Sequence, residues 1–265
     1  MIRLVTCLFL LFTYSYSMAQ TLEKIQFADN IVVAHRGAWK ANDFPENSIA
    51  ALRHAIEMKC TGSEFDVRMT SDEVLVVVHD KKHNSLQVEE STYAQLSEKK
   101  LENGEILPTL KEILLAGMRN NTSTGLVVEI KPSQTKERGQ LIASKVVELV
   151  DAVNAHPYIH TYISFDYAIL LKIMELNPKA KTEYLNGEKS PKELAKDGIN
   201  GLDYNVKVYR KKPSWILEAK ALGLSLSVWT ANSRKDLKFF IENEFNCITT
   251  NKPERLFKLI TKSQK

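Results

Sequence analysis

Short apolar runs alternate with amphipathic stretches along the chain from residue 31 onward. The first run, Ile31 to Ala34, predicts a strand. Ser48 to Lys59 predicts a helix, because Ile49, Leu52, Ala55 and Ile56 recur at helical spacing. The alternation then continues. It predicts strands at 63–68, 126–130, 162–165, 181–185, 201–204, 224–229 and 247–250, and helices at 109–115, 139–153, 167–176, 213–221 and 233–242.

The segment from Glu64 to Asp80 departs from this alternation, because only a short polar stretch, Thr70 to Glu73, separates two β-branched runs. So short a connection cannot reach a parallel neighbour, and an antiparallel hairpin is predicted. A turn centred on residues 71 and 72 would place His79 opposite Glu64. Because Glu64 and Asp66 lie two residues apart, they share one face of their strand. This face is either a solvated surface or a cation site, since adjacent carboxylates are costly to bury alone.

The strand count predicts the fold class. One of the nine predicted strands is the antiparallel return strand of the hairpin, and a (β/α)8 barrel requires the other eight. A doubly wound open sheet is the alternative, but no Gly-x-Gly-x-x-Gly motif follows the first strand. We therefore predict an α/β fold, a TIM barrel over residues 26–262, with a small polar insertion at 81–106.

In such a barrel the chemistry lies at the carboxyl ends of the strands. Glu64, Asp66 and Glu129 supply three carboxylates with no sulfur ligand, a set that suits one hard divalent cation, Mg²⁺ or Ca²⁺. Arg36 and Lys131 would offset the remaining negative charge and contact a phosphate.

Two histidines at strand ends complete this set. His35 and His79 would act as a general acid and base pair, which suits displacement at phosphorus. Each feature also has a structural explanation: a histidine at a strand end is often a packing residue, and Glu129 could form a buried ion pair with Lys131.

Charge and composition narrow the classes of partner. The chain is 44% hydrophobic and carries a formal net charge of +4, without a Lys/Arg block dense enough for nucleic acid or a membrane surface. Arg3, the apolar run Leu4 to Tyr14 and the small residues around Ala19 predict a signal peptide over 1–19, and hence a secreted or periplasmic protein. An uncleaved membrane tether is the alternative. Of the mature cysteines, Cys60 and Cys247 could pair but are expected to be buried free thiols.

Eight sequence blocks in order resemble the signature of the glycerophosphodiester phosphodiesterase family. They are His35-Arg36-Gly37, Pro45-Glu46-Asn47-Ser48, Glu64-Phe65-Asp66-Val67, Val78-His79-Asp80, Leu107-Pro108-Thr109-Leu110, Val128-Glu129-Ile130-Lys131, Val228-Trp229-Thr230-Ala231-Asn232 and Ile248-Thr249-Thr250-Asn251-Lys252-Pro253. The resemblance covers roughly residues 30–260.

The resemblance implies hydrolysis of a small-molecule glycerophosphodiester to glycerol phosphate and an alcohol, with the substrate's own hydroxyl attacking phosphorus. It matches Glu64, Asp66 and Glu129 to the metal ligands and His35 and His79 to the catalytic histidines. It matches Arg36 and Lys131 to the phosphate contacts and places Glu46 near them. Trp229 is expected to line the pocket wall or to pack in the core.

The chain departs from the family pattern at three points. Glu73 replaces a glycine in the hairpin turn, which matters little only if the turn avoids positive φ. Residues 81–85 replace an Arg-Thr-Thr run, so the resemblance does not specify which alcohol the enzyme would release. Asn251 replaces an aspartate. The alternatives to a glycerophosphodiesterase are a phospholipase acting on lysolipid or phosphoinositide, and a non-catalytic barrel that binds polyol phosphates.

Overall fold

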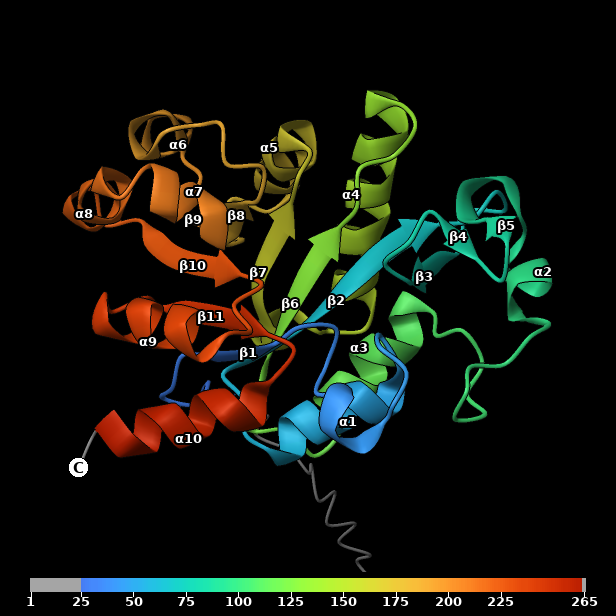
Figure 1. Cartoon of the computed structure of the whole chain (residues 1–265). Helices are drawn as coiled ribbons and strands as arrows, with labels where there is room; N and C mark the ends of the chain where they lie inside the picture. Colours follow the sequence, from blue (N-terminus) through green and yellow to red (C-terminus); the bar gives the residue numbers. More distant parts are fainter. Residues whose placement is uncertain (1–24, 264–265) are drawn as a thin grey trace, which may run out of the picture.

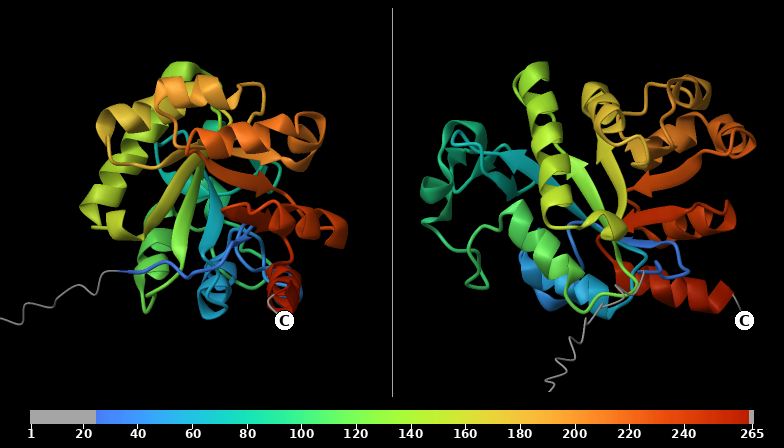
Figure 2. Two further views of the ribbon diagram at one scale, coloured as in Figure 1. Left: turned by 90° about the vertical axis from the view of Figure 1, so that its left-hand side faces the viewer. Right: turned by 180° about the vertical axis from the view of Figure 1, so that it is seen from behind.

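A closed barrel of parallel strands surrounded by helices forms the centre of the computed structural model, which describes residues 25–263 (Figures 1 and 2). The strands run around the barrel in the order β1-β2-β6-β7-β8-β9-β10-β11, and the pairing of β11 with β1 closes it. The predicted TIM barrel is confirmed. The predicted signal peptide lies outside the described residues.

The barrel strands fall within a few residues of the predicted positions. They are β1 (Val32–Ala34), β2 (Gly62–Met69), β6 (Gly125–Ile130), β7 (Ile159–Ser164), β8 (Thr182–Tyr184), β9 (Gly201–Asn205), β10 (Ser225–Trp229) and β11 (Cys247–Thr250).

Three of the helices around the barrel were not predicted from the sequence: Pro191–Asp197, Val206–Lys211 and Pro253–Ser263. A fourth helix that was not predicted, Tyr93–Ser97, lies in the insertion. The helices around the barrel are α1 (Ile49–Glu57), α3 (Leu110–Met118), α4 (Lys136–Ala152), α5 (Tyr167–Leu176), α6 (Pro191–Asp197), α7 (Val206–Lys211), α8 (Ser214–Ala221), α9 (Arg234–Glu242) and α10 (Pro253–Ser263), with short 3-10 helices η1 (Lys40–Asn42) and η3 (His156–Tyr158). Thr109 caps α3 as predicted, because its hydroxyl accepts a hydrogen bond from the Glu112 amide. In the part of the chain that the structure describes, no helix is long and apolar enough to cross a membrane.

Apolar side chains fill the space between the sheet and the helices, whereas the barrel interior holds a small apolar layer with polar residues around it. Val33, Val127 and Ile163 belong to the interior layer, together with Cys247. Cys60 and Cys247 are buried free thiols and do not pair.

The hairpin extends β2 beyond the barrel. The first residues of β2 pair with β1, and its last residues pair with the antiparallel β3 (Leu75–Val77), so β3 occupies the edge that β1 leaves free. The predicted register is wrong by one residue, because Val67 pairs with Val77 and Met69 with Leu75. Continued in this register, His79 would lie opposite Phe65 and not Glu64.

The physical reason is the turn. It contains three residues, and the third, Glu73, adopts φ 61°. The Thr70 amide donates to the Val74 carbonyl at 3.0 Å, which closes the loop in this form. The turn therefore includes a residue with positive φ, and the replacement of glycine by Glu73 is unfavourable at this position.

The insertion at 81–106 is an ordered unit rather than an irregular excursion. It contains β4 (Lys82–His83), β5 (Leu86–Gln87), η2 (Val88–Glu90) and α2 (Tyr93–Ser97) and projects beside β3 (Figure 1). Val88 and Leu96 pack with Val76 and Leu107 in a small core of their own. A polar segment therefore folds because a few apolar residues dock on the hairpin.

Candidate active site

A cavity of about 90 Å³ lies at the carboxyl ends of the barrel strands. Its lining brings together residues that are far apart in the sequence. The predicted site residues that line it are His35, Arg36, Glu64, His79, Glu129, Lys131 and Trp229. Asp66 lies directly beneath, where it contacts Arg36 and Lys131, and Glu46 lies to the side, on a larger neighbouring cavity.

Three carboxylates form the base of the site. Glu64, Asp66 and Glu129 are buried, and each offers one oxygen within 4.8 Å of those of the other two. Glu64 and Asp66 share a face of β2, and Asp66 pairs laterally with Glu129 of β6. Parallel pairing of two strands thus assembles the set that the sequence predicted.

The protonation chemistry of this cluster fits a divalent cation. Burial, Asp66 and Glu129 raise the pKa of Glu64 well above its usual range, and burial and Asp66 raise the pKa of Glu129 to about 7. Glu64 Oε1 is buried and accepts no hydrogen bond. Buried carboxylates this close together need protons or a cation, and an oxygen-only set of this kind suits Mg²⁺ or Ca²⁺.

Two basic side chains border the carboxylates. Lys131 Nζ lies 2.6 Å from Glu129 Oε1 and 3.2 Å from Asp66 Oδ1. Arg36 Nε lies 3.6 Å from Asp66, and its Nη1 lies 2.7 Å from Glu46. Both cations therefore stand beside the cluster, where they can meet an anionic oxygen of a ligand.

The turn after β1 fixes Arg36. Its backbone adopts φ 58°, and its amide donates to Glu64 Oε2 at 2.8 Å. Gly37 follows at φ 80°, where a Cβ atom would lie 2.7 Å from Ala51 of α1. The glycine of the His-Arg-Gly block is therefore required, because it lets the turn pack against α1.

The two histidines approach from different elements. His35 directly follows β1, and its Nε2 lies 4.0 Å from Glu64 Oε2. Burial and the charge of Arg36 lower the pKa of His35 to about 4. His79 follows β3, and its Nδ1 donates to Asp80 at 2.7 Å. His79 lines the cavity even though the hairpin register differs from the prediction. Arg68 Nε donates a hydrogen bond to the His79 carbonyl at 3.0 Å and so fixes the backbone there.

Aromatic rings form the opposite wall. Trp229 of β10 packs edge-on against Phe165 at 5.3 Å between centroids, and its Nε1 donates to the Asp203 carbonyl at 2.9 Å. Trp229 therefore lines the wall, as one of the two alternatives predicted. Lys131 Nζ lies 5.6 Å from the Phe165 centroid, so the aromatic wall reaches the cationic side of the site.

Sequence reasoning assigned no role to three polar residues of the site. Asn47 holds Asp66 through two hydrogen bonds, of 2.9 and 3.1 Å. Asn251 accepts a hydrogen bond from His35, and the buried Asp203 lines the cavity. The available signals were the position of Asn47 in the Pro-Glu-Asn block, of Asp203 on β9 and of Asn251 just after β11. Only the structure shows how these residues meet the rest of the site.

The remaining histidines lie elsewhere. His54 pairs with Glu57, His156 pairs with Asp151, and His160 packs against Phe27. His83 lines the larger neighbouring cavity.

Comparison with known proteins agrees with this geometry. The model of the glycerophosphoryl diester phosphodiesterase family matches residues 35–255. A glycerophosphodiester phosphodiesterase of Caldanaerobacter subterraneus subsp. tengcongensis is 28% identical over 249 residues, which cover 88% of this chain and 98% of that protein.

Solved structures share the fold. The crystal structure of a glycerophosphodiester phosphodiesterase from Parabacteroides distasonis is 37% identical with a TM-score of 0.85, covering 89% of this chain and 98% of the other. A phosphodiesterase from Oleispira antarctica, in complex with the product sn-glycerol-3-phosphate, is 20% identical with a TM-score of 0.75 and covers 88% and 97% of the two chains. At that identity the second likeness concerns the fold alone.

Proposed function

Because this chain belongs to the glycerophosphoryl diester phosphodiesterase family, we propose that it hydrolyses glycerophosphodiesters to glycerol 3-phosphate and an alcohol with one divalent cation. The observation that carries the proposal is the cluster of Glu64, Asp66 and Glu129 bordered by two histidines and two basic side chains in one cavity. These residue types in this arrangement support displacement at phosphorus.

The protein side chains have distinct parts in this mechanism. Glu64, Asp66 and Glu129 would hold the cation, which when bound polarises a phosphoryl oxygen as a Lewis acid. Arg36 and Lys131 orient the phosphate and balance its charge. One of His35 and His79 accepts the proton of the attacking glycerol hydroxyl, and the other donates a proton to the leaving oxygen. Water then opens the resulting cyclic phosphate.

The first experiment measures glycerol 3-phosphate release by the purified mature chain. Glycerophosphocholine and glycerophosphoethanolamine are each supplied with Mg²⁺, Ca²⁺ or EDTA. We expect release with one of the two metals and none with EDTA. If the folded protein released nothing with either metal, a lysolipid or phosphoinositide substrate, or a non-catalytic barrel, would replace the proposal.

We also propose export, on the basis of residues 1–19. Their pattern of Arg3, an apolar run and small residues is that of a cleaved signal peptide. Sequencing the N-terminus of the protein purified from the exported fraction tests this. A mature chain that starts just after Ala19 supports export, and an intact Met1 in the cytoplasmic fraction contradicts it.

A further inference from the structure

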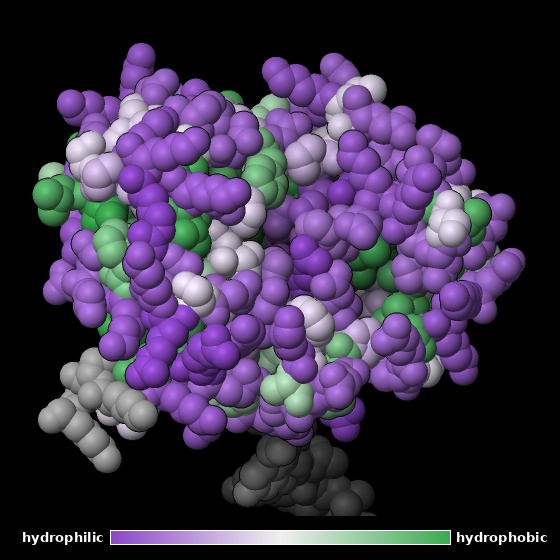
Figure 3. All heavy atoms as spheres, in the orientation of Figure 1, coloured by the Kyte–Doolittle hydropathy of each residue, from purple (hydrophilic) through white to green (hydrophobic). Residues whose placement is uncertain are grey.

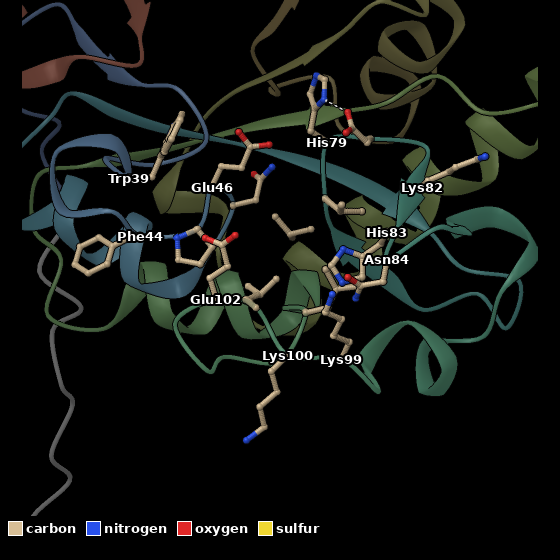
Figure 4. Close-up of a pocket in the computed structure, with 17 residues that line it drawn as sticks. Trp39, Phe44, Glu46, His79, Lys82, His83, Asn84, Lys99, Lys100 and Glu102 are labelled. Carbon is tan, nitrogen blue, oxygen red and sulfur yellow. Dashed lines mark hydrogen bonds and ion pairs between the residues drawn. The ribbon is translucent and has the colours of Figure 1, made fainter.

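A larger cavity of about 480 Å³ adjoins the catalytic cavity, and His79 lines both. One wall is the segment 39–47 before α1, and the other is formed by residues 82–84 and 99–102 of the insertion (Figure 4). Figure 3 shows this region as a recess in a largely hydrophilic face. A ligand held at the carboxylates can therefore extend past His79 into this space.

The walls of the larger cavity are fixed by contacts between the insertion and the barrel. Glu105 caps α1, because its carboxylate accepts from the amides of Ile49 at 2.8 Å and Ala50 at 3.0 Å. The Tyr93 hydroxyl donates to the Leu107 carbonyl at 3.0 Å. Because these contacts fix the insertion against the barrel, the cavity exists before any ligand binds, which lowers the entropic cost of binding.

A phosphodiester has two alcohol arms, and the two cavities differ in size and position. The phosphate lies with the carboxylates and basic residues of the smaller cavity. His79 borders both cavities, so one of the two arms can pass it into the larger cavity. The larger cavity is therefore placed to receive one arm of the substrate.

Two of the carboxylates that line this cavity are paired with a basic side chain, whereas its lysines, within the described residues, are not paired with an acidic one. Two of its carboxylates are engaged, Glu46 with Arg36 and Asp80 with His79, each at 2.7 Å. The insertion contributes the lysines Lys82, Lys99 and Lys100, and none of them has an ion pair within the described residues. Only one further carboxylate, that of Glu102, lines the cavity.

The lysines are not equivalent. Lys99 lies close enough to His83 to lower the pKa of that ring, together with burial, which is the larger cause. Figure 4 shows Lys82 and Lys100 at the rim with their side chains directed outward. Lys99 is therefore the residue best placed to meet a charged group in the cavity.

The aromatic residues of the opposite wall do not form a cage for a quaternary ammonium group. Lys40 Nζ lies over the Trp39 ring, 5.4 Å from its centroid. Phe44 packs edge-on against His54 at 6.0 Å. A choline would have to displace a cation from Trp39 and would face unpaired lysines, so its binding gains little from either ring.

We propose that the larger cavity is the subsite of the leaving alcohol and that it favours an alcohol bearing an anionic group, a carboxylate or a phosphate. This inference rests on the proposed function. It assigns substrate selection in this chain to Lys99, with a weaker contribution over a longer distance from Lys82 at the rim.

The test uses substrate pairs that differ by one anionic group. Glycerophosphoserine is compared with glycerophosphoethanolamine, and glycerophosphoinositol 4-phosphate with glycerophosphoinositol, by kcat/KM at low salt. We expect the anionic member to be favoured in at least one pair, by about three- to fivefold per lysine that faces the group. Added salt should weaken the preference.

The variants are Lys99→Gln, Lys99→Arg and the double variant Lys82→Gln/Lys99→Gln. Lys99→Gln should reduce the ratio, the double variant should bring it close to one, and Lys99→Arg should keep it. Lys238→Gln on the exposed face of α9 is the matched control and should leave the ratio unchanged.

The outcomes separate this inference from the proposed function. No hydrolysis of any glycerophosphodiester by the folded, metal-loaded protein would remove the function itself. Hydrolysis of all four substrates with no preference for the anionic members, or a preference that survives in the double variant, would overturn the assignment of this subsite and leave the function standing.

Discussion

His35 donates a hydrogen bond from Nδ1 to the side-chain oxygen of Asn251, across 2.5 Å. This bond selects the ring tautomer with the proton on Nδ1, so Nε2 faces Glu64 with its lone pair. The backbone amide of Asn251 in turn donates a hydrogen bond to Asn232 Oδ1 at 2.9 Å. The family resemblance predicts an aspartate at residue 251, and the oxygen of the asparagine found there accepts the hydrogen bond from His35. Asn251 is therefore a positioning residue for His35.

Replacing Asn251 by Leu should lower kcat by about 10- to 100-fold with little change in KM, because the ring loses the partner that orients it. Asn251→Asp should retain most of the activity, since a carboxylate oxygen accepts from Nδ1 equally well. Steady-state kinetics on glycerophosphoethanolamine distinguish the two. Equal losses in both variants would show that side-chain packing, and not the hydrogen bond, is what matters.

His35→Ala and His79→Ala should each lower kcat by about 10²- to 10⁴-fold, because each removes one proton transfer. Metal binding, measured by calorimetry, should remain nearly unchanged, since neither ring belongs to the three-carboxylate cluster. His156→Ala, which removes a histidine outside both cavities, is the control. Activity like that of the wild type in either active-site variant would end the proposed role of that histidine.

Glu64→Gln should weaken binding of the divalent cation and reduce the stabilisation that the metal provides. In the metal-free protein the variant should melt at a higher temperature, because a buried repulsion between carboxylates is removed. In the wild type, added Mg²⁺ or Ca²⁺ should raise the melting temperature, and this rise should shrink in the variant. Glu183→Gln, at a buried glutamate outside the cluster, is the matched control. Unchanged metal affinity in Glu64→Gln would exclude Glu64 from the ligand set.

The barrel and most of its site could be predicted because both depend on patterns that are local in the sequence. Each apolar run specifies a strand, and a polar residue just after it must lie at the mouth of a parallel barrel. This logic identified His35 just after β1, Glu64 on β2 and Glu129 on β6 without knowledge of their partners. Lateral pairing of Asp66 with Glu129 then brings the carboxylates together.

The parts that could not be predicted depend on one backbone angle or on contacts between distant segments. The left-handed conformation of Glu73 shifts the hairpin register by one residue, and its side chain gives no sign of it. Asn47 and Asp66 meet because the turn before α1 folds against β2. The larger cavity exists only where the insertion docks beside that turn, so no single stretch of sequence indicates it.

Glu73→Gly should stabilise the protein slightly. Glycine relieves about 1 kcal/mol of strain at φ 61°, which outweighs the small contribution of the exposed ion pair with Lys145. Denaturant unfolding measures the difference. Lys145→Gln, which removes the ion pair without changing the turn, is the control and should be slightly destabilising. A Glu73→Gly variant less stable than Lys145→Gln would contradict strain in the turn.

His160 should make the folded state sensitive to acid. It is mostly buried against Phe27 at 5.1 Å between centroids, and burial, followed by the charge of Lys181, lowers its pKa from 6.5 to about 4. Because the folded pKa lies below the unfolded value, the unfolded state binds the proton more readily. The stability from the neutral ring is therefore complete above about pH 6.5 and is lost as the pH falls toward 4. Between pH 7 and 5, the titration of His160 should lower the free energy of unfolding of the wild type by about 2 kcal/mol. In His160→Gln this contribution is absent, so its stability should fall less over the same pH range. Urea unfolding at the two pH values gives the comparison, with His156→Gln on η3 as the exposed control. The same pH dependence in His160→Gln and the wild type would mean that this ring is hydrated or protonated in the native protein.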